Sequence, residues 1–422
     1  MNFSQLPILE GYFESEKKKK YKMRTALLTA LLPLALARAP LYVPDREAQI
    51  IKDKYIIKFK DASIATAAAA DTVDGDVRDA SESLRSLSRG ADEVFTGPFH
   101  GFSSSNLDDE AIEALRDNPD VEFIEHDAIF TAQAYTTQLS ASWGLVRISH
   151  RQRYDGTETS YVYDSSAGVG TCAYVIDTGI DDSHPDFGGR ASQVADFSNS
   201  GGSGTDGNGH GTHLAGIIGG STYGVAKKTK LLGVKVLSDN GSGTTSAVIQ
   251  GMNFVATDRA ARGCPAGAAA NIAIGGSFSA SVNAAAKALV DAGVFVGVAA
   301  GNQGTSVGNY SPASEPLVCT VGAIDKADSV ANISNFGPGL DIFAPGRDIP
   351  STWIGGGVQT LSGTSTASAH VTGLGVYLAA LEGITNGALI CGRIQQLATQ
   401  GVLTGVPAGT VNLLAFNGNP SG

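Results

Sequence analysis

Short apolar runs alternate with longer segments of helical composition over the C-terminal two-thirds of the chain. Near-continuous apolar runs predict strands that are buried on both faces of a parallel sheet. These runs are 172–177 (CAYVID), 230–237 (KLLGVKVL), 271–276 (NIAIGG), 294–302 (VFVGVAAGN) and 318–324 (VCTVGAI). The helical segments are 210–220, 246–262, 280–293 and 365–381. This alternation predicts an α/β fold with right-handed crossovers and helices packed on the sheet.

The N-terminal third has a different pattern. Residues 54–60 (KYIIKFK) alternate apolar and basic positions, as a half-buried strand does, and 121–130 (VEFIEHDAIF) predict a second strand. Residues 108–118 have acidic residues in a first turn, with Ile112 and Leu115 on one face and Pro119 as a stop. The small and polar segment 65–89 is interpreted as a helix with a loop. Residues 53–131 therefore predict a small α+β unit.

Composition narrows the class of protein. The chain has 422 residues, 42% apolar and 17% charged, with 53 glycines, which is typical of a globular chain rich in turns. Its length suits a small domain followed by a large one. A net charge of −11 offers no basic footprint for nucleic acid.

The N-terminus predicts secretion. From Met23, Arg24 is followed by the short apolar run 26–36 and by the A-x-A site 35–37, so 23–37 reads as a signal peptide and 1–22 as a gene-model extension. The run is too short for a permanent membrane anchor, and no membrane partner is expected. In a secreted chain the four cysteines predict disulfides; buried thiols are the alternative, and a metal site is disfavoured because no C-x-x-C spacing exists. Three pairings remain open.

Four chemically useful residues fall where an open α/β sheet gathers its site, at the carboxyl ends of strands. Asp177 and Asn302 each end an apolar run, and His210 and Ser365 each stand where a glycine-rich loop enters a helix. A serine becomes a nucleophile when a histidine takes its proton and a carboxylate orients that histidine. The Asn302 side chain and the Ser365 N–H could stabilise an oxyanion. The alternatives are two turn formers, a loop histidine and a helix N-cap.

Other hydroxyl and imidazole groups nearby have a supporting interpretation. The helical offsets of His213 and His370 from His210 and Ser365 point their side chains elsewhere, which favours packing or hydrogen bonding. Ser362 and Thr364 are interpreted as turn residues.

The motifs DTGI, HGTH, AAGN and SGTS, in the order Asp, His, Ser, resemble those of the subtilisin-like serine proteases. The resemblance spans residues 143–417 and is closest to the secreted fungal proteinase K group, through LLGVKVL, NYSPASEP, CTVGA, STWIGG and GTVNLLA. It implies a subtilisin-like parallel sheet with helices on both faces, and a serine endopeptidase that works through an acyl-enzyme. By this resemblance Asp177 orients His210, His210 is the general base and acid, Ser365 is the nucleophile and Asn302 is the oxyanion donor.

Two positions depart from the family pattern. Thr366 replaces the usual Met after the serine, and Ala369 replaces the usual Pro before the helix histidine. Neither position supplies a catalytic group, so we expect altered rate or rim shape.

The resemblance also implies how a polypeptide substrate binds. The bound peptide would add a strand between two edges, and an uncharged pocket favours a large apolar or aromatic side chain before the cleaved bond. The edges are Gly241, Ser242, Gly243, Thr244 and Thr245, and Ala273, Ile274 and Gly275, with Val298, Ala299, Ala300 and Gly301 as the second pocket wall. Broad cleavage specificity is expected.

The N-terminal unit resembles the inhibitor-type propeptides of this family, through KYIIKFK and NPDVEFIEHDA. The resemblance implies a ferredoxin-like propeptide domain at about 53–131 within a propeptide of 38–135, which acts as an intramolecular inhibitor. Self-processing between Tyr135 and Thr136 would leave AQAY (132–135) in the cleft and release a monomeric peptidase of residues 136–422.

The same resemblance implies disulfides and a metal ion. It pairs Cys172 with Cys264 and Cys319 with Cys391. It also implies a structural calcium ion, which is not catalytic, held by the carbonyls of Pro316 and Val318 and the carboxylate of Asp341; the alternative is a plain loop carboxylate.

The sequence offers two rival functions. An inactive binder could use the same fold. A nucleotide-binding oxidoreductase is suggested by GNGHGTHLAG, but its glycines do not follow a strand as the dinucleotide fingerprint requires.

Overall fold

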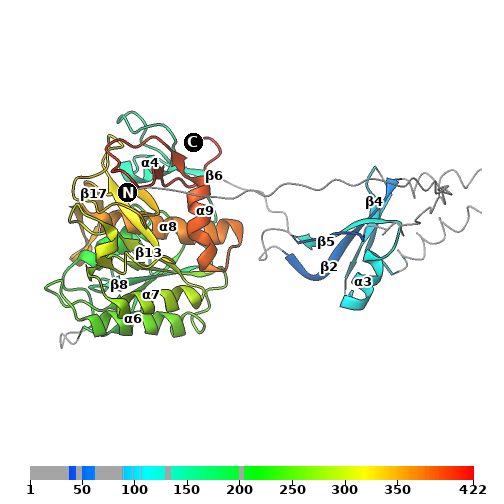
Figure 1. The fold of residues 1–422 in the computed structure, drawn as a ribbon, viewed down its shortest axis with the longest axis horizontal. Coiled ribbons are helices and arrows are strands. Elements are labelled where there is room, and N and C mark those ends of the chain that lie inside the picture. Colours follow the sequence, from blue (N-terminus) through cyan, green and yellow to red (C-terminus); the bar gives the residue numbers. More distant parts are fainter. Residues whose placement is uncertain are drawn as a thin grey trace, which may run out of the picture.

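The computed structural model describes residues 38–43, 50–61, 88, 90–96, 98–105, 107–128, 135–198 and 204–422, which form two units with separate cores (Figure 1). The predicted extension 1–22, the signal peptide 23–37 and nearly all of the predicted helical segment 65–89 lie outside the described residues.

The small unit is a five-stranded sheet with one described helix. Its strand order is β1-β5-β2-β4-β3, and every neighbouring pair is antiparallel except β1 with β5. The order β5-β2-β4-β3 is that of a ferredoxin-like fold, as expected. The elements are β1 (Leu41–Tyr42), β2 (Ile50–Phe59), β3 (Glu93–Thr96), β4 (His100–Ser105), α3 (Asp109–Arg116) and β5 (Val121–Ala128).

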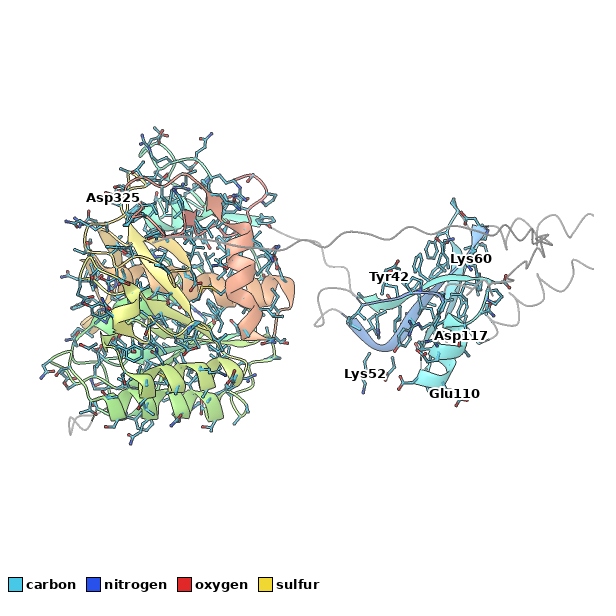
Figure 2. The ribbon with its side chains drawn as sticks, in the orientation of Figure 1. Tyr42, Lys52, Lys60, Glu110, Asp117 and Asp325 are labelled. Carbon is cyan, nitrogen blue, oxygen red and sulfur yellow. A yellow bond between two sulfur atoms is a disulfide. The ribbon has the colours of Figure 1, made fainter. Side chains whose placement is uncertain are left out.

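Helix α3 packs against this sheet as its sequence predicts. The Asp108 side chain caps it by accepting a hydrogen bond from the Ala111 N–H at 2.8 Å. Ile112 and Leu115 are buried with Ile57 of β2, whereas Glu110 lies exposed on α3 (Figure 2).

The large unit contains a nine-stranded sheet in the order β19-β20-β16-β15-β13-β11-β8-β10-β9. All neighbouring strands are parallel except β19 and β20. The strands are β8 (Cys172–Asp177), β9 (Ala191–Asp196), β10 (Lys230–Lys235), β11 (Ala268–Ile272), β13 (Phe295–Ala299), β15 (Cys319–Ile324), β16 (Ile342–Pro345), β19 (Thr399–Gln400) and β20 (Leu413–Leu414). The predicted parallel α/β sheet is confirmed.

Helices cover both faces of this sheet. Alternate residues of the interior strand β8 face opposite ways: Ala173 and Val175 join the core beneath α5 and α8, and Tyr174 and Ile176 join the core beneath α6 and α7. The helices are α4 (Trp143–Ser149), α5 (His210–Gly219), α6 (Thr245–Asp258), α7 (Ala280–Asp291), α8 (Thr364–Glu382) and α9 (Ile390–Leu397).

Smaller strand pairs complete the large unit. They are the antiparallel pairs β6 (Tyr135–Gln138) with β7 (Tyr161–Asp164), β12 (Gly276–Ser277) with β14 (Tyr310–Ser311), and β17 (Ile349–Trp353) with β18 (Gly357–Leu361). Strand β11 ends at Ile272, so most of the apolar run 271–276 continues beyond the strand. The hairpin β17–β18, which packs on α5, was not predicted.

Both disulfides form as the resemblance implied. Cys172 of β8 bonds to Cys264 after α6, and Cys319 of β15 bonds to Cys391 of α9. Each closes a long loop, with sequence separations of 92 and 72 residues, and so restricts the unfolded chain.

No single helix among the described residues is long and apolar enough to cross a membrane. By length and composition alone, 364–382 and 387–397 pass such a test as a pair bent by 112°.

Candidate active site

The carboxyl end of β8 meets the amino end of α5. Asp177 is the last residue of β8 and is fully buried, and His210 is the first residue of α5. The Asp177 Oδ1 atom lies 2.7 Å from His210 Nδ1, and it also accepts the Thr178 N–H at 2.8 Å. Because a carboxylate only accepts, Nδ1 carries the proton and Nε2 is left as the basic nitrogen.

The surroundings of His210 favour its protonated form. Burial alone would lower the pKa of His210, but the charge and the hydrogen bond of Asp177 outweigh it, and Asp206 adds a smaller effect, so the pKa is raised. The ring remains 27% exposed and can therefore reach a substrate. An imidazole held in this way can take a proton and return it.

Ser365 and Asn302 converge beside Gly363. Ser365 is the second residue of α8 and is 9% exposed. A Cβ atom on Gly363 would lie 3.0 Å from Ser365 Oγ and 3.3 Å from Asn302 Nδ2, which places the hydroxyl and the amide around one small space. The Asn302 Oδ1 atom accepts the N–H and the hydroxyl of Thr364 at 2.8 and 3.0 Å, so the amide presents its Nδ2 donor to that space.

Among the described residues, no hydrogen bond joins Ser365 Oγ to His210. Catalytic hydrogen bonds are often long in a free enzyme and tighten when substrate binds. The structure forms two pairs of predicted catalytic residues, Asp177 with His210 and Ser365 with Asn302. His210 and Ser365 lie in the first turns of α5 and α8, two helices that pack against each other.

A cleft of about 560 Å³ opens beside His210. Both predicted substrate edges, Gly241–Thr245 and Ala273–Gly275, line it. Neither edge is part of a strand, and Thr245 begins α6. His210 is the only titratable side chain in its described lining, which contains no Asp, Glu, Lys or Arg. The cleft can therefore receive an extended, uncharged segment.

Two predicted placements lie outside the described lining of this cleft. Val298 and Ala299 are buried in β13, and Ala300 and Gly301 lead from this strand to Asn302, so their role as a second pocket wall stays a prediction. Tyr135 is also absent from the described lining of the cleft; it begins β6 and pairs with Asp164 of β7. Residues 132–134 lie outside the described residues.

The two other helix histidines are supporting residues, as predicted. His213 Nε2 lies 3.1 Å from the carbonyls of Ile349 and Gln359, and His370 Nδ1 lies 2.8 Å from the Thr366 carbonyl. Carbonyls only accept, so these nitrogens carry the protons. Burial lowers the pKa of each histidine to about 4, and both are neutral at pH 7.

The two departures from the family pattern are accommodated inside α8. The Thr366 hydroxyl donates to the Gly363 carbonyl at 2.9 Å, and Ala369 is fully buried. Sequence reasoning missed the part played by Thr364, which is not only a turn residue: it also accepts the Gly301 N–H and so ties Asn302 and its neighbour to α8. It also missed Asp206, which lies three residues before the N-cap position Gly209 and so gives no ordinary capping signal.

Asp341 lies apart from the cleft, beside the Cys319–Cys391 disulfide. Its Oδ2 atom accepts the Thr320 N–H at 2.8 Å, and no Lys or Arg among the described residues pairs with it. Burial raises the pKa of Asp341 to about 6, and the Thr320 N–H partly opposes this. The sulfurs are bonded to each other and cannot act as thiolate ligands. A half-buried carboxylate without a Lys or Arg partner among the described residues suits a hard cation.

Comparison with known proteins identifies both units. Residues 168–398 match the model described as "Subtilase family", and residues 54–133 match that described as "Peptidase inhibitor I9". The chain is 54% identical to "Subtilisin-like serine protease AsES" of Sarocladium strictum (95% of this chain, 100% of that protein) and 51% identical to "Cuticle-degrading protease" of Metarhizium anisopliae (94% and 100%).

A solved structure gives the same answer. "Crystal structure of a cold adapted subtilisin-like serine proteinase" matches with a TM-score of 0.61 and 40% sequence identity, over 66% of this chain and 98% of that one. Proteinase R of Parengyodontium album is 49% identical, over 94% of this chain and 99% of its own length. The chain belongs to the subtilase family of serine proteases and carries a peptidase inhibitor I9 domain before its peptidase domain.

Proposed function

We propose that this chain is a secreted serine endopeptidase of broad specificity, made as a self-processed zymogen. Ser365 Oγ attacks the substrate carbonyl carbon while His210 Nε2 takes its proton, with Asp177 holding the imidazole. The oxyanion accepts hydrogen bonds from Asn302 Nδ2 and the Ser365 N–H. His210 then protonates the leaving amine, and water hydrolyses the acyl-enzyme. An extracellular location is proposed from the predicted signal peptide.

The observation that carries this proposal is the 2.7 Å contact between Asp177 and His210, which leaves Nε2 as the basic nitrogen of the imidazole. The space that Ser365 Oγ and Asn302 Nδ2 share beside Gly363 supports the role of Asn302 as oxyanion donor. An inactive binder would need none of this alignment.

The uncharged cleft supports a preference for large apolar or aromatic side chains before the cleaved bond. The test is hydrolysis of a chromogenic peptide ending in Phe by the purified protein, with and without a serine-directed sulfonyl fluoride, against matched peptides ending in Arg and Asp. Turnover of the Phe peptide that the inhibitor abolishes supports the proposal. Absence of turnover by a protein that begins at Thr136, or a strict preference for Arg, contradicts it.

The I9 domain supports zymogen processing with the propeptide as inhibitor. Cleavage between Tyr135 and Thr136 requires this segment to leave β7 and enter the cleft, where Tyr135 would present an aromatic side chain. The precursor of a Ser365→Ala variant should stay uncleaved, and N-terminal sequencing of the wild type should begin at Thr136. Equal processing of both proteins would assign the cleavage to another protease.

We also propose a structural calcium ion at Asp341, with the carbonyls of Pro316 and Val318 as further ligands. The ion would supply the positive charge that this half-buried carboxylate lacks and would take no part in the reaction. Adding a chelator should lower the melting temperature of the wild type. Asp341→Asn should melt at the lower temperature and lose its response to calcium; an unchanged response would overturn the site.

A further inference from the structure

The loop that leads into α5 is folded around one buried carboxylate. Asp206 is 6% exposed, and its two oxygens accept four hydrogen bonds. Oδ1 accepts the N–H groups of Asn208 and Gly209 at 3.0 and 2.8 Å. Oδ2 accepts the N–H and the hydroxyl of Thr212 at 3.0 and 2.6 Å. These contacts fix the backbone on both sides of His210.

Asp206 is also joined to the strand that carries Asp177. The Thr212 hydroxyl, while donating to Asp206, accepts the Asp181 N–H at 2.8 Å. A Cβ atom on Gly179 would lie 3.2 Å from the Asp206 nitrogen, so the loop lies directly against the turn after β8. The carboxylate thus connects the two chain segments whose separation sets the contact between Asp177 and His210.

We propose that Asp206 is a second acidic partner of His210, a positioning residue that fixes its backbone and holds its positive charge during catalysis. This inference rests on the proposed role of His210 as general base. Asp206 reaches the imidazole through the backbone and through space, whereas Asp177 bonds to it directly.

Several other titratable groups belong to the elements packed against α5. They include Asp177 of β8, Lys230 and Lys235 of β10, His370, Tyr377 and Glu382 of α8, His184 and Asp186 at the 3₁₀ turn Pro185–Phe187, and His213 of α5 itself. His213 and His370 are neutral at pH 7. The Lys235 ammonium donates to the Thr178 carbonyl and to Asp239, so its charge is compensated. Asp206 is thus the carboxylate that adds to Asp177 in raising the pKa of His210.

The decisive variant is Asp206→Asn, measured as the pH profile of kcat/KM for the Phe peptide and normalised to active sites titrated with the sulfonyl fluoride. An amide keeps one acceptor oxygen and cannot satisfy both Gly209 and Thr212. We expect the plateau value of kcat/KM to fall by about ten- to a hundredfold, because the His210 backbone would be held less firmly. Because one negative charge is removed, the pKa of His210 that sets the acid limb should also fall.

Two matched variants separate charge from folding. Thr212→Val keeps the Asp206 charge and removes the bridging hydroxyl, so it should lower the plateau without moving the acid limb. Asp182→Asn removes one exposed charge outside this network and should change neither value. The pH dependence of inactivation by the sulfonyl fluoride gives the same pKa without peptide binding.

The outcomes are distinguishable. A lower plateau together with a lower acid limb in Asp206→Asn supports the inference. An unchanged acid limb overturns it, whatever the plateau, because a purely structural residue would leave the pKa of His210 alone. A wild type that the sulfonyl fluoride does not inactivate would refute the proposed function instead.

Discussion

Helices α5 and α8 both begin at the site, but their first turns are built in opposite ways. At α5, nearby side chains accept hydrogen bonds from the leading N–H groups. The His210 N–H donates to Asn208 Oδ1 at 3.3 Å, and the Gly211 N–H donates to Thr178 Oγ1 at 2.9 Å. The Thr212 N–H donates to Asp206 Oδ2. At α8 the Thr364 N–H bonds to Asn302, and no partner is found among the described residues for the Ser365 N–H.

This difference follows from what each helix start must do. The start of α5 holds an imidazole in place, and satisfied donors make it rigid. The start of α8 must bind a transient negative charge, and an unpaired N–H at a helix N-terminus is suited to that. The preceding glycines differ accordingly. Gly209 has φ 103°, a left-handed conformation, whereas Gly363 leaves space beside Ser365 Oγ.

The largest effect on activity should come from removing the proposed nucleophile at the start of α8. Ser365→Ala deletes the attacking oxygen and leaves the helix N–H and Asn302 in place. Residual catalysis of about 10³–10⁴-fold over the uncatalysed reaction should remain, carried by oxyanion stabilisation and binding. Steady-state hydrolysis of the Phe peptide measures it. A variant retaining near wild-type activity would place the nucleophile elsewhere.

The next largest effect tests the oxyanion donor beside the start of α8. Asn302→Ala removes the side-chain donor, and kcat should fall by about a hundred- to a thousandfold, the range that loss of such a donor causes in the related enzyme subtilisin. KM should change little, because the bond forms mainly in the transition state. Pre-steady-state kinetics with the Phe peptide resolves the two.

A matched variant separates donation from support of α8. Asn302→Asp keeps an oxygen acceptor for Thr364 and removes the donor, so it should lose activity as Asn302→Ala does while retaining more stability. If Asn302→Asp keeps near wild-type kcat, the amide acts only by holding Thr364.

Each of the two helices contains a buried neutral histidine, so both should lose stability in acid. His213 and His370 have folded pKa values of about 4, below the unfolded value of 6.5. The unfolded chain therefore binds protons first, and stability present above pH 6.5 is lost as the pH falls toward 4, by about 3 kcal/mol per histidine at most.

Urea unfolding of the inactive Ser365→Ala protein between pH 7 and pH 4 measures this slope without self-digestion. His213→Gln and His370→Gln should each flatten it, because glutamine does not titrate. A slope that neither variant changes would trace acid sensitivity to other groups.

The sequence predicted the framework well because parallel buried strands leave long apolar runs. β8, β10, β13 and β15 were each recognised in this way, as was α3 from Asp108 and its two buried apolar residues. The predicted end of β11 was wrong because its apolar run continues past Ile272 into residues 273–275. These residues line the cleft and belong to no strand. The hairpin β17–β18 was missed because its glycines and polar residues give weak periodicity.

Prediction of the site was limited for a related reason. The motifs indicated which groups carry the chemistry, but hydrogen bonds between segments distant in sequence cannot be read from a motif. The contact between Thr364 and Asn302 joins residues 62 positions apart, and Thr178 reaches Gly211 across 33 positions. Val298 shows the converse: an uncharged residue near the site can belong wholly to the core.

The smallest predicted effect tests whether the hydrogen-bonded first turn of α5 stabilises the protein. Thr178→Val keeps the shape of the buried side chain and removes the acceptor of the Gly211 N–H. A buried unpaired N–H should lower the free energy of unfolding by about 1–2 kcal/mol, with a change of only a few-fold in kcat. Urea unfolding in the Ser365→Ala background measures it.

The control variant lies two residues before α8. The exposed Ser362 hydroxyl accepts the Asp348 N–H at 2.9 Å, and Ser362→Ala should cost less than about 0.5 kcal/mol because water can replace it. A large loss in Thr178→Val and a small one in Ser362→Ala would mean that stability is concentrated where the base is held. Equal losses would mean that the two helix starts differ in chemistry but not in rigidity.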